Sequence, residues 1–300
     1  MNTRETVAAQ TGAPYAYQTN PTPSSQAVLS CQNLVVDYQA GPSVSSHSAA
    51  LNAGAAAGSV HTLALSHVSF QLAQGESVAV MGPSGSGKST LLHAMAGIIR
   101  PNSGQVVYRG QELGALSDAE RTKLRRTDFG FVFQSGQLLP ELPAVENVAL
   151  PLMLGGMDYR QAIQEAMQWL DRFGLAQLAQ SRPGEMSGGQ MQRVSIARAL
   201  SIGPSVVFAD EPTGALDQRT GHEVMGILTG AARSTGAAVI VVTHDPQVAS
   251  YCSRTLTMRD GMFVSADSGM PSQSVVQSAV QSPAQEQPHN QGAQTQGGAR

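Results

Sequence analysis

The sequence predicts an α/β fold built around a mostly parallel sheet. A short apolar segment at 76–81 leads into a glycine-rich loop and then into a helical pattern at 90–97. Closer to the C-terminus, strand-like segments at 205–210 and 238–243 are separated by a helical segment at 220–234. Alternation of strand and helix is typical of parallel strands joined by crossover helices.

An antiparallel β portion is expected before this core. Strand-like segments lie at 34–38, 65–72 and 104–108. Apolar and polar residues alternate poorly within 65–72, so the sequence does not assign the buried face of that strand. Residues 117–120 form a capping box, Ser-Asp-Ala-Glu, which predicts the start of a short helix.

A helical subdomain is expected at about 135–185. Asp158 begins a second cap-like segment, and Gly174 can end the helix that follows it. Between them an apolar stripe repeats at helical spacing: Ile163, Ala166, Met167, Leu170 and Phe173. We interpret this stripe as packing within the subdomain.

Three low-complexity segments interrupt or flank the ordered body, which we place at 30–265. Residues 1–29 and 266–300 are rich in small and polar residues without apolar periodicity, and both are predicted to be disordered tails. Residues 40–58 are rich in Gly, Ser and Ala and are predicted to form a flexible loop between two strands.

Composition and residue spacing give no support for several function classes. The formal net charge is −3, which gives no electrostatic reason to expect a nucleic-acid partner. The basic run at 121–126 is interpreted as a solvated helix face. Cys31 and Cys252 lack metal-ligand spacing and suit a reducing compartment. The strongly apolar run at 237–242 suits a buried strand, because a membrane-spanning helix needs about 20 such residues. The first 20 residues show no signal-peptide pattern.

The glycine-rich loop carries the strongest chemical signal. It fits the pattern G-x-x-x-x-G-K-[ST] and comprises Gly82, Pro83, Ser84, Gly85, Ser86, Gly87, Lys88, Ser89 and Thr90. Backbone N–H groups of such a loop surround phosphate oxygens, and the following helix N-terminus adds positive charge. Lys88 would reach the β- and γ-phosphates, and the Ser89 hydroxyl would bind Mg²⁺. A plain glycine-rich turn is the alternative, but strand, loop and helix agree on a P-loop.

Two carboxylates follow the apolar strand at 206–210. A buried parallel strand would bring Asp210 to the edge of the sheet where the phosphate loop lies. Asp210 is predicted to hold Mg²⁺ and Glu211 to polarise the attacking water. A strand followed by Asp-Glu is a weak signal alone and gains weight from the phosphate loop.

A second glycine-rich helix start begins at Ser187 and continues through Gly188, Gly189 and Gln190. Ser187 can cap the helix, and capping alone is the simpler interpretation. The two glycines also leave backbone N–H groups free to meet a phosphate. Because one site does not need two phosphate loops, we expect this helix end to close on the nucleotide of another subunit.

Together these motifs resemble the ATP-binding subunit of ABC transporters. Residues 82–90 resemble Walker A, 186–190 the LSGGQ signature and 206–211 Walker B. Residues 214–217 resemble the D-loop and 243–245 the switch-histidine segment. Gln134 resembles the Q-loop glutamine. The motifs follow the family order, and the resemblance covers 30–265.

The resemblance implies a RecA-like P-loop NTPase core, ATP and Mg²⁺ as cofactors, and a head-to-tail dimer. Gln134 would contact Mg²⁺ and the attacking water, and His244 would hold the γ-phosphate. Asp217 would cross the dimer interface. Tyr38 would stack on adenine, although an ordinary strand tyrosine is a serious alternative because the 40–58 loop follows it.

A finer resemblance points to the lipoprotein-release and macrolide-export branch, on the segments 130–134, 138–140 and 146–152. Met186 in place of leucine and Ala215 in place of asparagine depart from its pattern. The branch implies an export-type permease partner and a location on the cytoplasmic face of the cell membrane. A cell-division-type signalling ATPase is the alternative. Ribosome- or DNA-acting relatives are disfavoured, since the chain has one cassette and no long coiled coil.

The leucines beyond Gln134 admit two interpretations. Leu138, Leu139 and Leu142 could contact the permease or pack inside the helical subdomain, and the sequence does not choose between these roles.

Overall fold

The computed structural model describes residues 27–39 and 61–268. The three segments predicted to lack order lie outside these residues, except at two edges where that prediction is wrong. Residues 27–29 belong to strand β1 (Ala27–Gln39), and residues 266–268 belong to β10 (Met262–Ser268). The strand extends because Val28 and Leu29 are buried and Leu29 pairs with strands on both sides.

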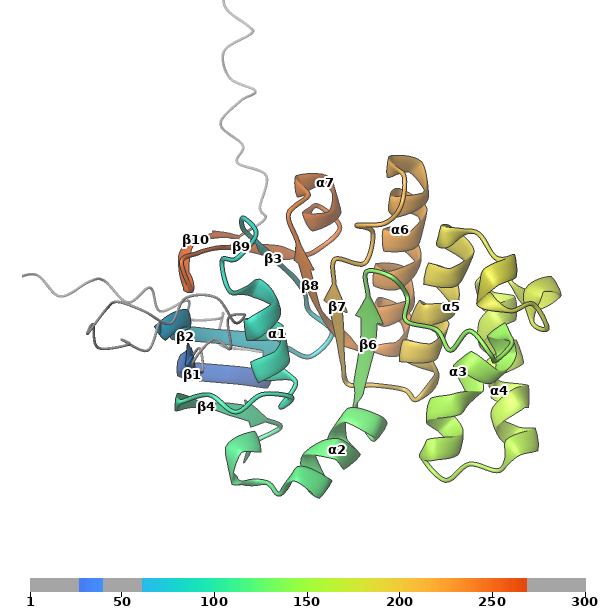
Figure 1. Ribbon diagram of the computed structural model, residues 1–300, viewed down its shortest axis with the longest axis horizontal. Helices are drawn as coiled ribbons and strands as arrows, with labels where there is room; N and C mark the ends of the chain where they lie inside the picture. Colours follow the sequence, from blue (N-terminus) through green and yellow to red (C-terminus); the bar gives the residue numbers. More distant parts are fainter. Residues whose placement is uncertain (1–26, 40–60, 269–300) are drawn as a thin grey trace, which may run out of the picture. The chain divides into compact units, whose positions relative to one another are not determined.

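The centre of the molecule is a six-stranded sheet in the order β10-β9-β3-β8-β7-β6 (Figure 1). Neighbouring strands are parallel except for the β9–β10 pair. The strands are β3 (Ser77–Met81), β6 (Phe129–Phe133), β7 (Val206–Asp210), β8 (Ala238–Thr243) and β9 (Arg254–Arg259). Parallel strands covered on both faces read as continuous apolar runs.

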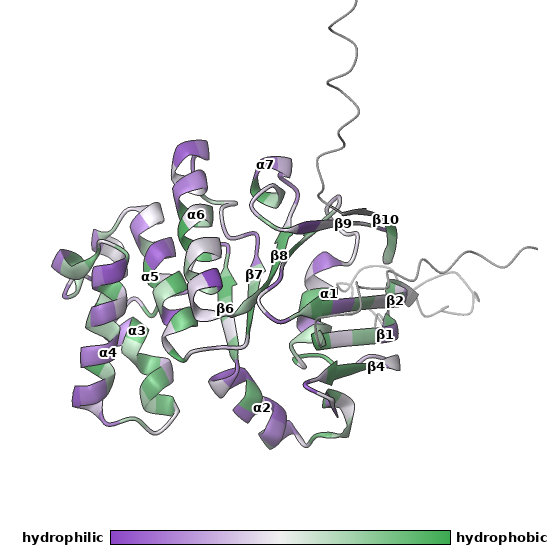
Figure 2. Ribbon diagram, turned by 180° about the vertical axis from the view of Figure 1, so that it is seen from behind, coloured by the Kyte–Doolittle hydropathy of each residue, from purple (hydrophilic) through white to green (hydrophobic). Residues whose placement is uncertain are grey.

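The two faces of this sheet bury different neighbours. Val206 and Phe208 pack with helix α1 (Lys88–Met95), whereas Val207 and Ala209 pack with α5 (Gly188–Ser201) and α6 (Gln218–Thr235). Successive residues of a strand point to opposite faces, so one short strand supports both cores. Figure 2 shows the hydrophobic central strands between these layers.

A second, antiparallel sheet has the order β2-β1-β4-β5. Its other strands are β2 (His61–Ala73), β4 (Ser103–Tyr108) and β5 (Gln111–Glu112). In β2 the buried residues change from Leu65 to Val68, which breaks a strict period of two. His67 lies between them with φ 52°, so this irregularity explains the poor alternation in the sequence.

A group of helices packs on α5. They are α3 (Ala144–Leu154), α4 (Tyr159–Arg172) and the short helices Ala176–Leu178 and Pro183–Glu185. Ala166 and Leu170 of the predicted stripe are buried in the core, and Gly174 follows α4 with φ 68°. The predicted fold class, a P-loop-type α/β core with an antiparallel β portion and a helical insertion, is confirmed.

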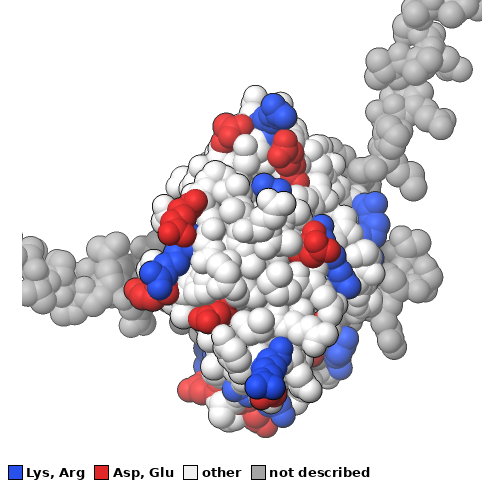
Figure 3. Space-filling view, turned by 90° about the vertical axis from the view of Figure 1, so that its right-hand side faces the viewer, with Lys and Arg blue, Asp and Glu red and all other residues white. Residues whose placement is uncertain are grey.

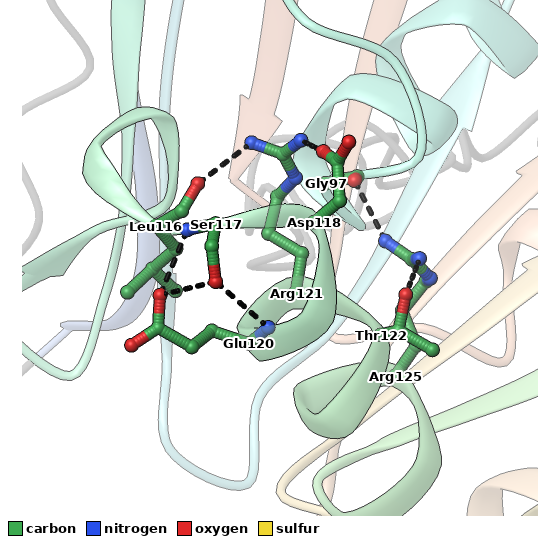
Figure 4. Close-up of polar contacts among 8 residues, drawn as sticks. All are labelled: Gly97, Leu116, Ser117, Asp118, Glu120, Arg121, Thr122 and Arg125. Carbon is green, nitrogen blue, oxygen red and sulfur yellow. Dashed lines mark hydrogen bonds and ion pairs between the residues drawn. The ribbon is translucent and has the colours of Figure 1, made fainter.

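Helix α2 (Asp118–Thr127) begins with the predicted capping box between Ser117 and Glu120 (Figure 4). The interpretation of its basic run as a solvated face is wrong in part. Arg121 is 8% exposed, donates to the Leu116 carbonyl and contacts Asp118, while Arg125 donates to the Gly97 carbonyl at 2.8 Å. Arg125 therefore connects α2 to the segment that follows α1, whereas Arg121 stabilises the start of α2.

Two short helices, Leu113–Ala115 and α7 (Pro246–Ala249), complete the described elements. Within 27–39 and 61–268, no helix is both long and apolar enough to span a membrane.

Candidate active site

The phosphate loop lies between β3 and α1, where the sequence predicts it. Lys88 is buried, and its ammonium group donates to the carbonyls of Gly82 and Pro83 at 2.9 Å each. The Ser86 hydroxyl is buried without a hydrogen-bond partner among the described residues. Pro83, Ser84, Gly85 and Ser89 are exposed. Exposed loop residues together with an unsatisfied buried hydroxyl fit the binding of an anionic, phosphate-type ligand.

Neighbouring backbone holds this loop from two sides. A Cβ atom on Gly87, whose φ is 97°, would lie 2.3 Å from the Ala64 carbonyl oxygen of β2. A Cβ atom on Gly82 would lie 2.1 Å from the Met258 carbonyl oxygen of β9. The Gly261 N–H also donates to the Ser86 carbonyl at 3.1 Å. The loop is thus fixed by close backbone contacts that only glycine permits.

Two of the three residues predicted to hold Mg²⁺, Ser89 and Asp210, lie together. The Ser89 hydroxyl donates to the Asp210 carboxylate at 3.2 Å, across the edge of the sheet. No group of three or more His, Cys, Asp or Glu side chains in the described residues could form a metal site by itself. Mg²⁺ is typically held by one or two carboxylates together with substrate phosphates, so the Ser89–Asp210 pair fits that ion.

Glu211 and His244 form a direct pair. His244 Nδ1 lies 3.0 Å and 2.9 Å from the two carboxylate oxygens of Glu211. The Glu211 N–H donates to the Val242 carbonyl of β8, and its φ of 48° lies in the left-handed region. Holding a non-glycine residue in this region destabilises the fold by about 1–3 kcal/mol. Such strain is common at functional sites, where a side chain must be held in one orientation.

Gln134 follows β6 and is exposed. Its backbone is held by the signature helix α5, because Gln192 donates to the Phe133 carbonyl and Arg198 donates to the Gly136 carbonyl. Its side-chain amide lies against Gly214, where a Cβ atom would be 2.8 Å from Nε2. The structure therefore places Gln134 beside the segment that follows Glu211.

The signature segment begins α5. The Ser187 hydroxyl accepts from the Gln190 N–H, and the Gln190 side chain accepts from the Ser187 N–H at 2.8 Å. Added Cβ atoms on Gly188 and Gly189 would lie 3.1 Å from Leu216 Cδ2 and 2.3 Å from Thr220 Cγ2. This helix start is therefore packed against the start of α6.

Asp217 caps α6. Its carboxylate accepts from the N–H and the hydroxyl of Thr220 at 3.1 and 2.7 Å. These bonds lower the pKa of the exposed Asp217 carboxyl below its usual value. The resemblance predicts that Asp217 crosses a dimer interface. The bonds to Thr220 show that Asp217 also has a structural role within its own chain.

Residues 65–214 match the sequence profile of the ABC transporter family. The chain belongs to this family. Two dimeric structures of MJ0796, a bacterial ABC transporter cassette, are each 36% identical with a TM-score of 0.69, and one is bound to ADP and Pi. Each match covers 80% of this chain and 98% of MJ0796. CbiO1 from Clostridium perfringens, part of the ABC transporter complex cbiONQ, is 25% identical with a TM-score of 0.67. That match covers 82% of this chain and 89% of cbiO1. The chain is thus an ABC ATPase cassette.

Tyr38 lies near the end of β1 in this cassette, opposite Thr62 of β2, and is 46% exposed. Two residues beyond Thr62, Ala64 makes the close contact with Gly87 described above. Strand β2 therefore connects the phosphate loop to Tyr38, a position compatible with a stacking role beside a bound base.

Sequence reasoning missed three supports of the cassette's site. The β9–β10 hairpin was not predicted, although Asp260-Gly261, both with positive φ, is a strong hairpin-turn signal. Gln192 and Arg198 were also missed. Both occur on the signature helix, but only the folded structure shows that they face the segment around Gln134.

Proposed function

We propose that this cassette binds and hydrolyses Mg-ATP in a head-to-tail dimer and so powers a partner permease. The observation that carries the proposal is the convergence of Ser89, Asp210, Glu211 and His244 at one edge of the sheet. Lys88 and the loop N–H groups would bind the phosphates. Ser89, Asp210 and Gln134 would hold Mg²⁺, which supplies charge neutralisation at the γ-phosphate.

In this proposal the side chains of the chain position water and charge. Glu211 would accept a hydrogen bond from the attacking water and orient it. His244, held by the same carboxylate, would stabilise charge on the γ-phosphate oxygens. Attack at phosphorus needs little covalent help from protein, so such positioning provides most of the catalysis.

The dimer follows from the signature segment. Ser187, Gly188 and Gly189 start a helix that packs on α6 of its own chain, and a helix start favours an anion. The similar cassette MJ0796 is dimeric, which supports a dimer of this chain, and in that dimer this end would meet the nucleotide of the second copy. Asp217 would lie at the same interface.

The experiment uses Glu211→Gln. This variant should keep ATP binding but lose turnover by about 10²–10⁴-fold, the usual contribution of a positioned base. With ATP it should elute as a dimer, and adding Ser187→Arg should return it to monomer. Turnover within a few-fold of wild type would reject Glu211 as the base.

A matched control separates the interface from helix capping. Ser117 caps α2 with the same capping-box geometry as Ser187, remote in sequence from the signature segment. Ser117→Arg in the Glu211→Gln background should lose a similar capping energy, about 1 kcal/mol, yet still dimerise. If both arginine variants are monomeric, or both dimeric, the shared-site proposal fails.

We place the permease contact beyond Gln134, at Leu139. Leu138 packs partly buried against the helical core, whereas Leu139 is 42% exposed. Buried Asn147 accepts from the Leu139 N–H at 2.7 Å and donates to its carbonyl at 3.0 Å, so the exposed side chain has a rigid base. A rigid, exposed apolar side chain is a typical interface anchor.

Charge on the adjoining surface is consistent with such an apolar contact. On the side of the molecule that carries α3, α4 and α5 in Figure 1, acidic and basic groups are interspersed around a broad uncharged area (Figure 3). No electrostatic feature of that face favours nucleic acid. Leu139→Asp should abolish co-purification with the permease, and Leu154→Asp, another exposed leucine, is the control.

The sequence segment 146–152 supports an export-type system, with the cassette bound to the cytoplasmic face of the membrane. The partner expected on this basis has few membrane helices and a large extracytoplasmic domain. Affinity isolation from native membranes, followed by reconstitution, tests this. ATP-dependent release or transport of cargo supports export, whereas ATP turnover without any cargo movement would favour the cell-division-type signalling alternative.

A further inference from the structure

Gly214 lies where the residues proposed for catalysis meet. Its N–H donates to the Glu211 carbonyl at 3.0 Å. The Gln134 side chain fills the space in front of its Cα, because an added Cβ would lie 2.8 Å from Nε2, 3.1 Å from Cδ and 3.3 Å from Cγ. One exposed residue thus touches the backbone of the proposed base and the amide of the Q-loop glutamine.

The backbone of Gly214 does not itself require glycine. Its φ lies outside the left-handed region, in contrast to many other glycines of the chain. An alanine could therefore adopt the same conformation, and at an exposed position it would ordinarily be harmless. The requirement for glycine comes from the space that Gln134 occupies.

We propose that Gly214 is a positioning residue that sets where the Gln134 amide lies. The main chain around Gln134 cannot retreat easily, since Gln192 and Arg198 hold the Phe133 and Gly136 carbonyls. A methyl group at position 214 would therefore rotate the exposed amide instead. Reaching ordinary contact at about 3.5–4.0 Å from the added carbon requires a displacement of roughly 1 Å.

This inference rests on the proposed function, because it requires Gln134 to act in hydrolysis. A displacement of about 1 Å in a positioned group can cost up to ~10²-fold in rate. Gly214→Ala should therefore lower kcat by roughly 10–100-fold and raise the Mg²⁺ concentration needed for half-maximal activity. The KM for ATP should stay unchanged, since Lys88 and the phosphate loop are untouched.

The control is Gly226→Ala. Gly226 is exposed on α6, and an added Cβ meets no atom within 4 Å. This variant should match wild type in kcat and in Mg²⁺ dependence. Both alanine variants should unfold at or above the wild-type temperature, because the displaced group in Gly214→Ala is the flexible end of a side chain.

The decisive measurement is a double-mutant cycle with Gln134→Ala, followed by steady-state ATPase assays of the full chain. A shortened residue 134 leaves room for the added methyl group. Gly214→Ala should therefore cost nothing further in the Gln134→Ala background.

Three results would overturn the inference. Wild-type kcat in Gly214→Ala, with an impaired Gln134→Ala, would show that the contact does not position the amide. An equal loss from Gly214→Ala in both backgrounds would mean that it acts through Glu211 or through the fold. Wild-type turnover in Gln134→Ala would remove the role assigned to Gln134 in the proposed function, and this inference with it.

Discussion

Gly189→Ala should destabilise the cassette, whereas Gly188→Ala should not. Both glycines lie in the first turn of α5. A Cβ atom at 189 would lie 2.3 Å from Thr220 Cγ2, well over 1 Å inside ordinary contact. At 188 the nearest atom is Leu216 Cδ2 at 3.1 Å, the end of a flexible side chain that can move away.

Thr220 cannot move away as easily as Leu216. Its hydroxyl donates to the Asp217 carboxylate at 2.7 Å, and its N–H donates to the same group at 3.1 Å. Rotating the threonine side chain would break its hydroxyl bond to Asp217, one of the two bonds between Thr220 and the residue that caps α6. Overpacking of this kind costs about 1–3 kcal/mol, and replacing a helical glycine returns about 0.5–1 kcal/mol. The net loss should be about 1–2 kcal/mol, or roughly 2–8 °C in Tm.

The assay is urea or thermal unfolding followed by circular dichroism, with Thr220→Ser as the compensating change. Serine keeps the hydroxyl that bonds Asp217 and removes the methyl group that meets the new Cβ. Gly189→Ala should therefore cost much less stability in the Thr220→Ser background than in wild type. Equal losses in the two backgrounds, or a Gly189→Ala variant as stable as wild type, would refute this packing argument.

Three further predictions concern strain, a buried amide and the thiols. Because Glu211 has φ 48°, Glu211→Gly should be more stable than Glu211→Ala by about 1 kcal/mol in urea unfolding, the reverse of the usual order. Asn147 bonds the backbone of Leu139, Leu142 and Pro143, so Asn147→Ala should cost about 2–4 kcal/mol, and a loss under 1 kcal/mol would contradict its role. Burial raises the pKa of both cysteine thiols to about 12, so maleimide at pH 8 should label the folded cassette only slowly, as mass spectrometry would show.

The parallel core was predictable because its strands read as continuous apolar runs. Strand β8 has the bounds that the sequence predicts, and β7 differs by one residue. The position of the polar residues at the strand ends was also predictable, since carboxyl ends of parallel strands meet at one edge of the sheet. The segments at 76–81 and 206–210 needed no tertiary information beyond that rule.

Irregular and local features were not predictable in the same way. The left-handed His67 shifts the buried face of β2, and no residue type in the segment signals that shift. From the sequence, Arg121 is expected to be a surface charge. Only the folded structure shows its partners, the carbonyl of Leu116 and the carboxylate of Asp118. The triplet at 27–29 is too short to suggest a strand until its partners on β2 and β4 are known.

Three contacts between motifs in this cassette share one physical form, a glycine facing a side chain from elsewhere in the sequence. Gly214 faces Gln134, Gly188 faces Leu216, and Gly189 faces Thr220. Without Cβ atoms the segments approach closely, so moving one segment changes its contact with the side chain of the next. Leu216 and Thr220 lie a few residues beyond Gly214, Leu216 just before α6 and Thr220 in the first turn of α6. In the proposed dimer, the signature helix start that would meet the partner's nucleotide is linked, through this segment, to the glutamine proposed to act at the cassette's own nucleotide. Closure around one nucleotide would then affect the other site through these contacts, and the two glycine cycles described above test the two ends separately.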